Sequence, residues 1–355
     1  MAEALSFDSA PLAAEVRLAI TRMPPGLRRT APNDLSIRRR RNGSGFCYVG
    51  PSGKVVRDAT TLQRLKSLAV PPAYEEVLFA EDSKAHLQAV GRDAAGRLQY
   101  RYHPDWQKVR ERHKARRLVA LVQTLPRIRR CVSKHLAVGE PTREFVLATI
   151  IELVARSAIR PGSETYARAH GTRGAATLLK SNVSIKRDTV TLTFRGKGGQ
   201  AVHREIRSRR LAAAIDILRQ LPGRRLFQYR DETGAAHLVR RRDVNEFLHA
   251  TAGVRISLKD FRTLMASTSV LEALAHIAPA KSERLRRRQI LEAVRTAAEE
   301  LSNTATVCRK SYVHDTIFAA FENGALRRFS AELKQCRSWS GRERVLAQIV
   351  SAAVT

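Results

Sequence analysis

The sequence predicts an α+β protein with two domains, a small β-rich N-terminal domain and a larger, mainly helical domain that contains a small sheet. Its 355 residues suffice for two domains of ~100–200 residues each, and 43% of them are hydrophobic, enough for a packed core. Short aromatic or β-branched runs alternate with Gly, Pro and Asn turns over residues 23–105, whereas helical periodicity dominates from about residue 109. We therefore expect an N-terminal extension at 1–22, a β-rich domain at 23–108 and a helical domain at 109–355.

Two elements stand out in the β-rich segment. The run FCYV (46–49) is followed by GPSG and then KVV, a pattern that predicts a hairpin. The segment TLQRLKSLAV (61–70) is expected to form a helix that ends at the prolines of positions 71–72, because proline disfavours helical backbone in the residue before it.

Helices and one hairpin are expected in the second segment. Thr142 precedes a long apolar-periodic run and is a residue type that caps helix N-termini. The glycines of KGGQ (197–200) predict a tight turn between two strand-like runs. The expected elements are helices at 109–125 and 142–159, strands at 182–196 and 201–207, and mainly helix from 211 onward with a turn-like break at 221–235.

Charge is the strongest compositional signal. The chain has 64 Lys and Arg residues, 51 of them Arg, against 33 Asp and Glu, which gives a formal net charge of +31. Arg carries a planar fork of donors that matches phosphate oxygens. A basic folded domain is typical of nucleic-acid binding, and an acidic membrane surface or an acidic protein partner remains an alternative.

Several classes of site and protein are excluded by missing motifs. The four cysteines form no CxxC pair, the ten histidines form no HExxH, and no GxxxxGK[ST] loop is present, so we expect neither a metal site nor an ATPase. No apolar run approaches the ~18 residues of a membrane helix, and the N-terminus lacks the basic region of a signal peptide. We expect a cytoplasmic, nucleoid-associated protein that contacts no membrane and requires no cofactor.

Four boxes carry a more specific signal. They are IRPGSETYA (159–167), FRGKGG (194–199), LKDFRTLMAS (258–267) and NTATVCRKSYVHDTIF (303–318). Together they resemble the small bacterial and poxvirus-like type IB DNA topoisomerases, and the resemblance extends over roughly residues 23–350. It implies two lobes that close around duplex DNA as a clamp, in a protein that acts as a monomer.

A nucleophile is the first requirement for cutting and resealing a strand. A Tyr hydroxyl can form a phosphotyrosine that retains the energy of the phosphodiester bond. Tyr312 lies in the CRKSY box beside Arg309 and Lys310. Because the ordinary pKa of Tyr is ~10, cations near the phosphate are needed for reaction at neutral pH.

The resemblance implies roles for five further residues. Arg160 and Arg262 match the arginines that hold the non-bridging phosphate oxygens, and Lys197 matches a hairpin Lys that protonates the leaving 5′-oxygen. Lys259 is a second member of that proton path. Asn303 stands where the family carries His or Asn, and an amide there can donate a hydrogen bond to a phosphate oxygen but cannot serve as a base.

Two boxes depart from the expected family pattern. Asp315 follows Val-His where a Pro is expected, and Pro161 and Ser163 replace more usual residues after Arg160. These departures lie beside the matched positions without removing a side chain that carries chemistry. They bear on local backbone geometry only.

The leading hypothesis is a type IB topoisomerase that nicks one strand, lets it swivel and reseals it without ATP or metal, with Mg²⁺ at most stimulating. A tyrosine recombinase is the first alternative, but recombinases usually carry His three residues before the second Arg, where this chain has Lys259. A non-enzymatic architectural DNA-binding protein is the second alternative, and its activity would not require Tyr312.

Overall fold

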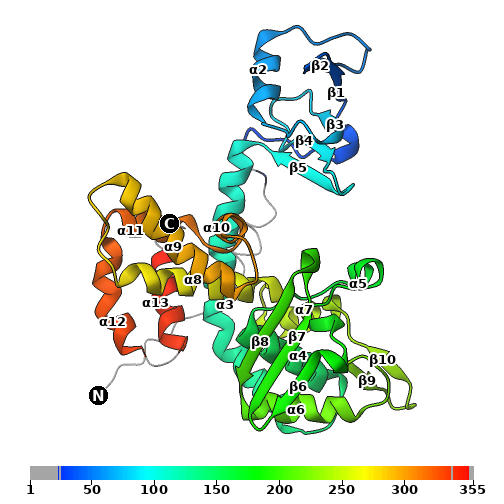
Figure 1. Ribbon diagram of the computed structural model, residues 1–355, viewed down its shortest axis with the longest axis vertical. Helices are drawn as coiled ribbons and strands as arrows, with labels where there is room; N and C mark the ends of the chain where they lie inside the picture. Colours follow the sequence, from blue (N-terminus) through cyan, green and yellow to red (C-terminus); the bar gives the residue numbers. More distant parts are fainter. Residues whose placement is uncertain (1–22, 24, 337–338, 352–355) are drawn as a thin grey trace. The chain divides into compact units, whose positions relative to one another are not determined.

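The computed structural model of the protein describes residues 23, 25–336 and 339–351 (Figure 1). The expected extension at 1–22 lies outside the described residues. The chain divides into two compact units between His113 and Lys114, inside a long helix, whereas the sequence placed a boundary between 108 and 109. The predicted α+β class is confirmed, since antiparallel sheets in both units accompany a mainly helical second unit.

The first unit is an antiparallel sheet with one helix packed on it. The strand order is β2-β1-β3-β4-β5, and Leu65 of the helix is buried with Ile37, Val77 and Phe79 of the sheet. The elements are β1 (Ile37–Asn42), β2 (Gly45–Val49), α2 (Ala59–Ser67), β3 (Glu75–Phe79), β4 (Leu87–Arg92), β5 (Leu98–Tyr102) and the start of α3 (Pro104–Ala137).

The predicted hairpin between FCYV and KVV is present in a short form. An antiparallel bridge joins Val49 to Val55, and Val56 N donates to Tyr48 O at 2.8 Å. The main partner of β2 is however β1, with which it pairs along its whole length, from Arg38 with Val49 to Asn42 with Gly45. The charged run Ile37–Asn42, IRRRRN, gave no strand signal because its Arg side chains obscured the alternation, although Ile37 is buried.

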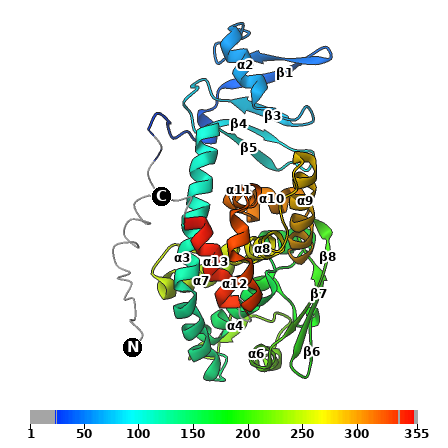
Figure 2. The same ribbon diagram turned by 90° about the vertical axis from the view of Figure 1, so that its left-hand side faces the viewer.

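The second unit is built around a buried helix, α4 (Arg143–Ser157). Every residue from Phe145 to Val154 is buried, and Thr142 is confirmed as the N-cap, since its side chain accepts from Phe145 N. Helix α4 contacts α6, α7, α8 and the three-stranded sheet β6-β7-β8 (Figures 1 and 2). A helix enclosed on all sides is a rigid base for the loop that follows it.

The remaining elements of this unit follow in chain order. They are α5 (Glu164–His170), β6 (Val183–Lys186), β7 (Thr189–Arg195), β8 (Ala201–Arg207), α6 (Arg209–Gln220), β9 (Gln228–Arg230), β10 (Ala236–Leu238), α7 (Arg241–Ala252), α8 (Leu258–Ala275), α9 (Glu283–Glu300), α10 (Ala305–Tyr312), α11 (Asp315–Glu322), α12 (Ser330–Gln335) and α13 (Trp339–Ser351). The predicted break at 221–235 holds the short β9 strand, which pairs with β10.

Two chain segments cross closely just after α4. Ala158 ends the helix in the left-handed conformation (φ 48°), and Arg160 follows. Ala175 N donates to Arg160 O at 2.8 Å, which ties the loop to a second segment. A Cβ on Gly174 would lie 2.5 Å from Arg160 O and 2.5 Å from Gly162 N, so only glycine permits this crossing. The crossing fixes the backbone of Arg160.

We predict that Gly174→Ala destabilises the protein by about 1–3 kcal/mol, because the added methyl group overpacks against backbone that cannot yield. Thermal or denaturant unfolding of the variant measures the change. Gly45→Ala is the control, since a Cβ there meets nothing closer than Asn42 O at 3.8 Å. Equal stability of the two variants would show that the Arg160 loop moves freely.

Candidate active site

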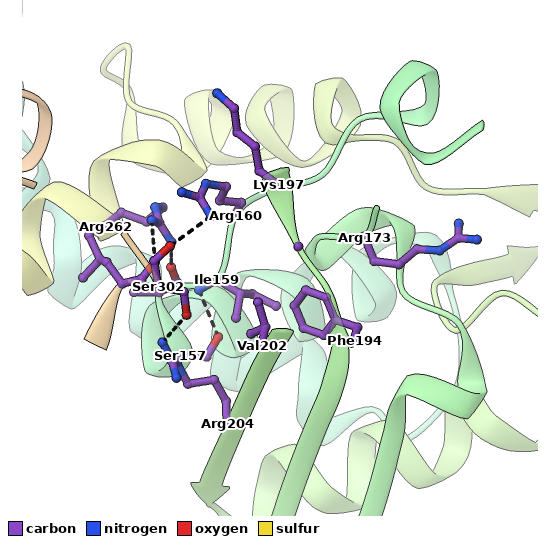
Figure 3. Close-up of a pocket in the computed structure, with 13 residues that line it drawn as sticks. Ser157, Ile159, Arg160, Arg173, Phe194, Lys197, Val202, Arg204, Arg262 and Ser302 are labelled. Atoms are coloured by element: carbon purple, nitrogen blue, oxygen red, sulfur yellow. Dashed lines mark hydrogen bonds between the residues drawn. The ribbon is translucent and has the colours of Figure 1, made fainter. Parts of the chain in front are cut away.

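The C-terminal turn of α9 binds two guanidinium groups (Figure 3). Arg262, on α8, is 1% exposed, and it donates through Nη2 to Leu301 O at 3.0 Å and through Nη1 to Ala158 O. Arg160 donates through Nη1 to Ser302 O at 3.4 Å. Carbonyls at a helix C-terminus lack intrahelical partners and carry the negative end of the helix dipole. They therefore hold both cations in place.

Asn303 joins this group through its side chain. Its Oδ1 accepts a hydrogen bond from Arg160 Nη2. Its Nδ2 is buried and has no acceptor within the part of the chain that the structure describes. A buried donor without a partner is costly in a folded protein, so a ligand oxygen beside it would be bound favourably.

Tyr312 is the last residue of α10 and is 9% exposed. Its carbonyl accepts from Ser267 Oγ at 3.0 Å, and the next carbonyl, of Val313, accepts from Lys114 Nζ at 2.6 Å. Arg262 Cζ lies 4.9 Å from the centre of the Tyr312 ring, and Lys259 Nζ lies 5.9 Å from it. The phenol is thus held against two cations.

The cations outweigh burial in setting the pKa of Tyr312. Burial raises this pKa because it disfavours the phenolate, whereas the positive charges of Arg262, Arg160 and Lys259 lower it. The net result is a pKa below the ordinary value of 10.0. In turn, burial and then the charge of Arg262 lower the pKa of Arg160. The site concentrates positive charge around one phenol.

Lys197 lies at the tip of the β7–β8 hairpin. Gly198 and Gly199 follow it with φ of 76° and 75°, the left-handed turn that the glycines predicted. Arg160, Arg262 and Lys197 all line a small pocket of about 10 Å³, roughly the space of one water. The Lys197 side chain is exposed and extends away from the two guanidinium groups in Figure 3.

The structure therefore brings Tyr312, Arg262, Arg160, Asn303 and Lys259 together, and it leaves the Lys197 ammonium at the edge of the cluster. Three further residues support the cluster and were not found from the sequence: Lys114, Arg117 and Arg204.

Arg117 illustrates why such supporting residues cannot be identified from the sequence. Its Nη2 donates to Asp260 Oδ2 at 2.7 Å, and the same carboxylate oxygen accepts from Ser257 N in the capping box that begins α8. Lys114 and Arg117 share one face of α3 at the i, i+3 spacing, which the sequence does contain. Nothing in the sequence indicates what that face contacts.

Comparisons with known proteins match the chain to a family. The model of the catalytic core of eukaryotic DNA topoisomerase I matches residues 103–338, and that of the bacterial DNA topoisomerase IB N-terminal domain matches residues 45–93. A DNA topoisomerase 1B of Acanthamoeba polyphaga mimivirus is 30% identical over 294 residues, which cover 81% of this chain and 88% of the relative. The chain belongs to the type IB DNA topoisomerases. It is an enzyme of the isomerase class, and its substrate is DNA.

Asp315 and Pro161, which depart from the topoisomerase pattern, both fit the local structure around them. Asp315 is the first residue of α11, where an acidic side chain favours the helix dipole, and His314 caps that helix. Pro161 O accepts from Ala176 N at 2.9 Å, as part of the crossing beside Arg160. Neither departure displaces a side chain of the cluster.

Within the described ranges, no group of three or more His, Cys, Asp or Glu side chains is arranged to hold a metal ion. None of the helices in those ranges has the length and apolar character needed to span a membrane.

We predict that Lys259→Met raises the pKa of Tyr312, because it removes a positive charge that favours the phenolate, while Lys259→Arg leaves the pKa close to that of the wild type. Lys259 is exposed, so neither change disturbs the core. A pH titration of phenolate absorbance, with the matching Tyr312→Phe protein subtracted in each background, isolates this one Tyr. An unchanged titration in Lys259→Met would mean that solvent screens the Lys259 charge completely.

Proposed function

We propose that this topoisomerase relaxes positive and negative supercoils by cutting one strand through a 3′-phosphotyrosyl intermediate, allowing the strand to swivel and resealing it. The observation that carries the proposal is the position of Tyr312, a buried phenol whose pKa is lowered by Arg262, Arg160 and Lys259. A phenol placed in this way is an activated nucleophile for a phosphodiester.

Cleavage transfers the phosphate from one oxygen to another. Tyr312 loses its proton to solvent, its Oη attacks phosphorus, and the bond from phosphorus to the 5′-oxygen breaks. Lys197 gives its proton to that departing oxygen, with Lys259 as a second member of the proton path. Religation runs the same steps backwards, so that Lys197 accepts the proton of the 5′-hydroxyl and Tyr312 leaves.

Three groups are assigned to the charge that develops on the phosphate. Arg160 and Arg262 direct guanidinium forks to the non-bridging oxygens, and the Asn303 Nδ2 amide donates to one of them. The two arginines supply the positive charge that a metal ion would otherwise provide. The phosphotyrosine retains the energy of the broken bond, so neither ATP nor a metal is required. We also propose that one chain acts alone, as a clamp on duplex DNA.

We predict that the purified protein relaxes plasmids of either supercoil sign with EDTA present and ATP absent, and that Tyr312→Phe does not. A suicide substrate nicked near the cleavage site should trap the DNA covalently on Tyr312, as peptide mapping would show. Strict dependence of cleavage on Mg²⁺ would contradict this mechanism. Formation of sequence-specific joints between plasmids would favour recombination instead.

We predict that Lys197→Ala slows cleavage of normal DNA by about 10²–10⁴-fold, the usual contribution of a general acid, yet leaves cleavage nearly unchanged when sulfur replaces the bridging 5′-oxygen. A thiolate leaves without protonation, so the acid is needed only for oxygen. Single-turnover cleavage on both substrates measures the effect. Equal slowing on both would assign Lys197 an electrostatic role and make Lys259 the better candidate for the acid.

A further inference from the structure

Arg204, on β8, binds the end of α9. Its Nη2 donates to Glu300 O at 2.7 Å, to Ser302 Oγ at 2.7 Å and to Glu299 O at 3.1 Å, and its Nη1 donates to His203 O at 2.7 Å. The guanidinium is therefore held by backbone and hydroxyl acceptors, and these contacts make Arg204 a bridge between two elements (Figure 3).

The turn that Arg204 binds is the one that holds the two arginines of the active site. Glu299 O and Glu300 O accept from Arg204, Leu301 O accepts from Arg262, and Ser302 O accepts from Arg160. Four successive carbonyls thus receive three guanidinium groups from three different elements. Ser302 itself adopts the left-handed conformation, with φ of 47°, and its side chain is held by Arg204.

The same Arg204 belongs to the hairpin that carries Lys197. Strands β7 and β8 pair without a break from Thr189 with Arg207 to Arg195 with Ala201, and Arg204 faces Leu192 in that register. At ~3.3 Å per residue, Arg204 lies about 10 Å along the strand from the turn at Ala201. An uninterrupted set of strand hydrogen bonds over this short length is stiff. The contacts of Arg204 with α9 therefore fix the direction of the β7–β8 turn that carries Lys197.

The position of Arg204 carries an electrostatic cost that its contacts offset. Burial lowers the pKa of Arg204 and the positive charge of Arg262 lowers it further, whereas the negative charge of Glu300 raises it. The hydrogen bonds from Arg204 to Glu299 O, Glu300 O and Ser302 Oγ also oppose this cost. These contacts are the structural evidence that Arg204 connects β8 to the end of α9.

We propose that Arg204 is a positioning residue that joins the Lys197 hairpin to the α9 turn, so that Lys197 and the arginines that bind the phosphate keep one relative geometry. The inference rests on the proposed role of Lys197 as the general acid. Arg204 touches neither the phosphate nor the leaving oxygen in this role, and it acts through Lys197.

The test compares single-turnover cleavage of normal DNA with that of DNA carrying a bridging 5′-sulfur. Arg204→Ala should slow cleavage of normal DNA by about 10–100-fold, a part of the full contribution of the acid, and should cleave the sulfur substrate at nearly the wild-type rate. Arg204→Lys keeps the charge without the fork, so it should show the same pattern with a smaller loss. Arg207→Ala, on the opposite face of β8, is the matched control and should behave like the wild type on both substrates.

A double variant tests whether Arg204 acts through Lys197. Lys197→Ala with Arg204→Ala should cleave normal DNA no more slowly than Lys197→Ala alone, since a positioning residue has no effect once its target is removed. Additive losses would overturn the proposal, as would equal slowing of Arg204→Ala on both substrates or no slowing on either.

The wider mechanism is tested separately by Lys197→Ala in the same assay. If sulfur rescues Lys197→Ala but not Arg204→Ala, only the role of Arg204 fails. If sulfur rescues neither, the general-acid role of Lys197 fails together with the inference drawn from it. Should Arg204→Ala not fold, as judged by thermal unfolding, Arg204→Lys and Ser302→Ala are measured in its place and are expected to give the same substrate-dependent pattern.

Discussion

The active-site cluster depends on the attraction between the carbonyls at the end of α9 and the guanidinium groups that surround them. Arg160 and Arg262 repel one another, and burial together with the charge of Arg262 lowers the pKa of Arg160. The carbonyls of Leu301 and Ser302 offset this cost with direct hydrogen bonds. Charge-assisted hydrogen bonds of this kind are stronger than neutral ones. Without that turn, the positive field that lowers the pKa of Tyr312 would not form.

A rigid frame behind the turn determines how accurately these groups are placed. Helix α4 is buried from Phe145 to Val154 and ends at Ser157, three residues before Arg160, and the crossing at Gly174 fixes the loop that follows it. Helix α8 supports Arg262, and its Ser267 holds the carbonyl of Tyr312. The reacting groups therefore stand on packed helices, which keeps their positions within the narrow limits that phosphoryl transfer requires.

Some of the Arg residues that make up the excess positive charge have a structural role. In the first unit, Arg39 donates to the carbonyls of Val70, Pro71 and Tyr74 and stacks on the Phe46 ring at 4.2 Å. In the second unit, Arg204 and Arg262 are bound by backbone carbonyls. The formal charge of +31 consequently overstates what is available to DNA phosphates, although it correctly indicated the substrate.

The sequence by itself determined the class of fold, the helices with strong periodicity and caps, and the family, because these depend on local patterns and short boxes. It did not indicate that β1 is the main partner of β2, since the alternation of β1 is hidden by four successive Arg residues. It also gave no sign of the roles of Lys114, Arg117 and Arg204. Only the tertiary structure decided which of the 51 Arg residues meet the α9 turn. The physical reason is that Arg160 and Arg262 lie 142 and 39 residues from the carbonyls that they bind at this turn. Local sequence patterns carry no information about contacts at such separations.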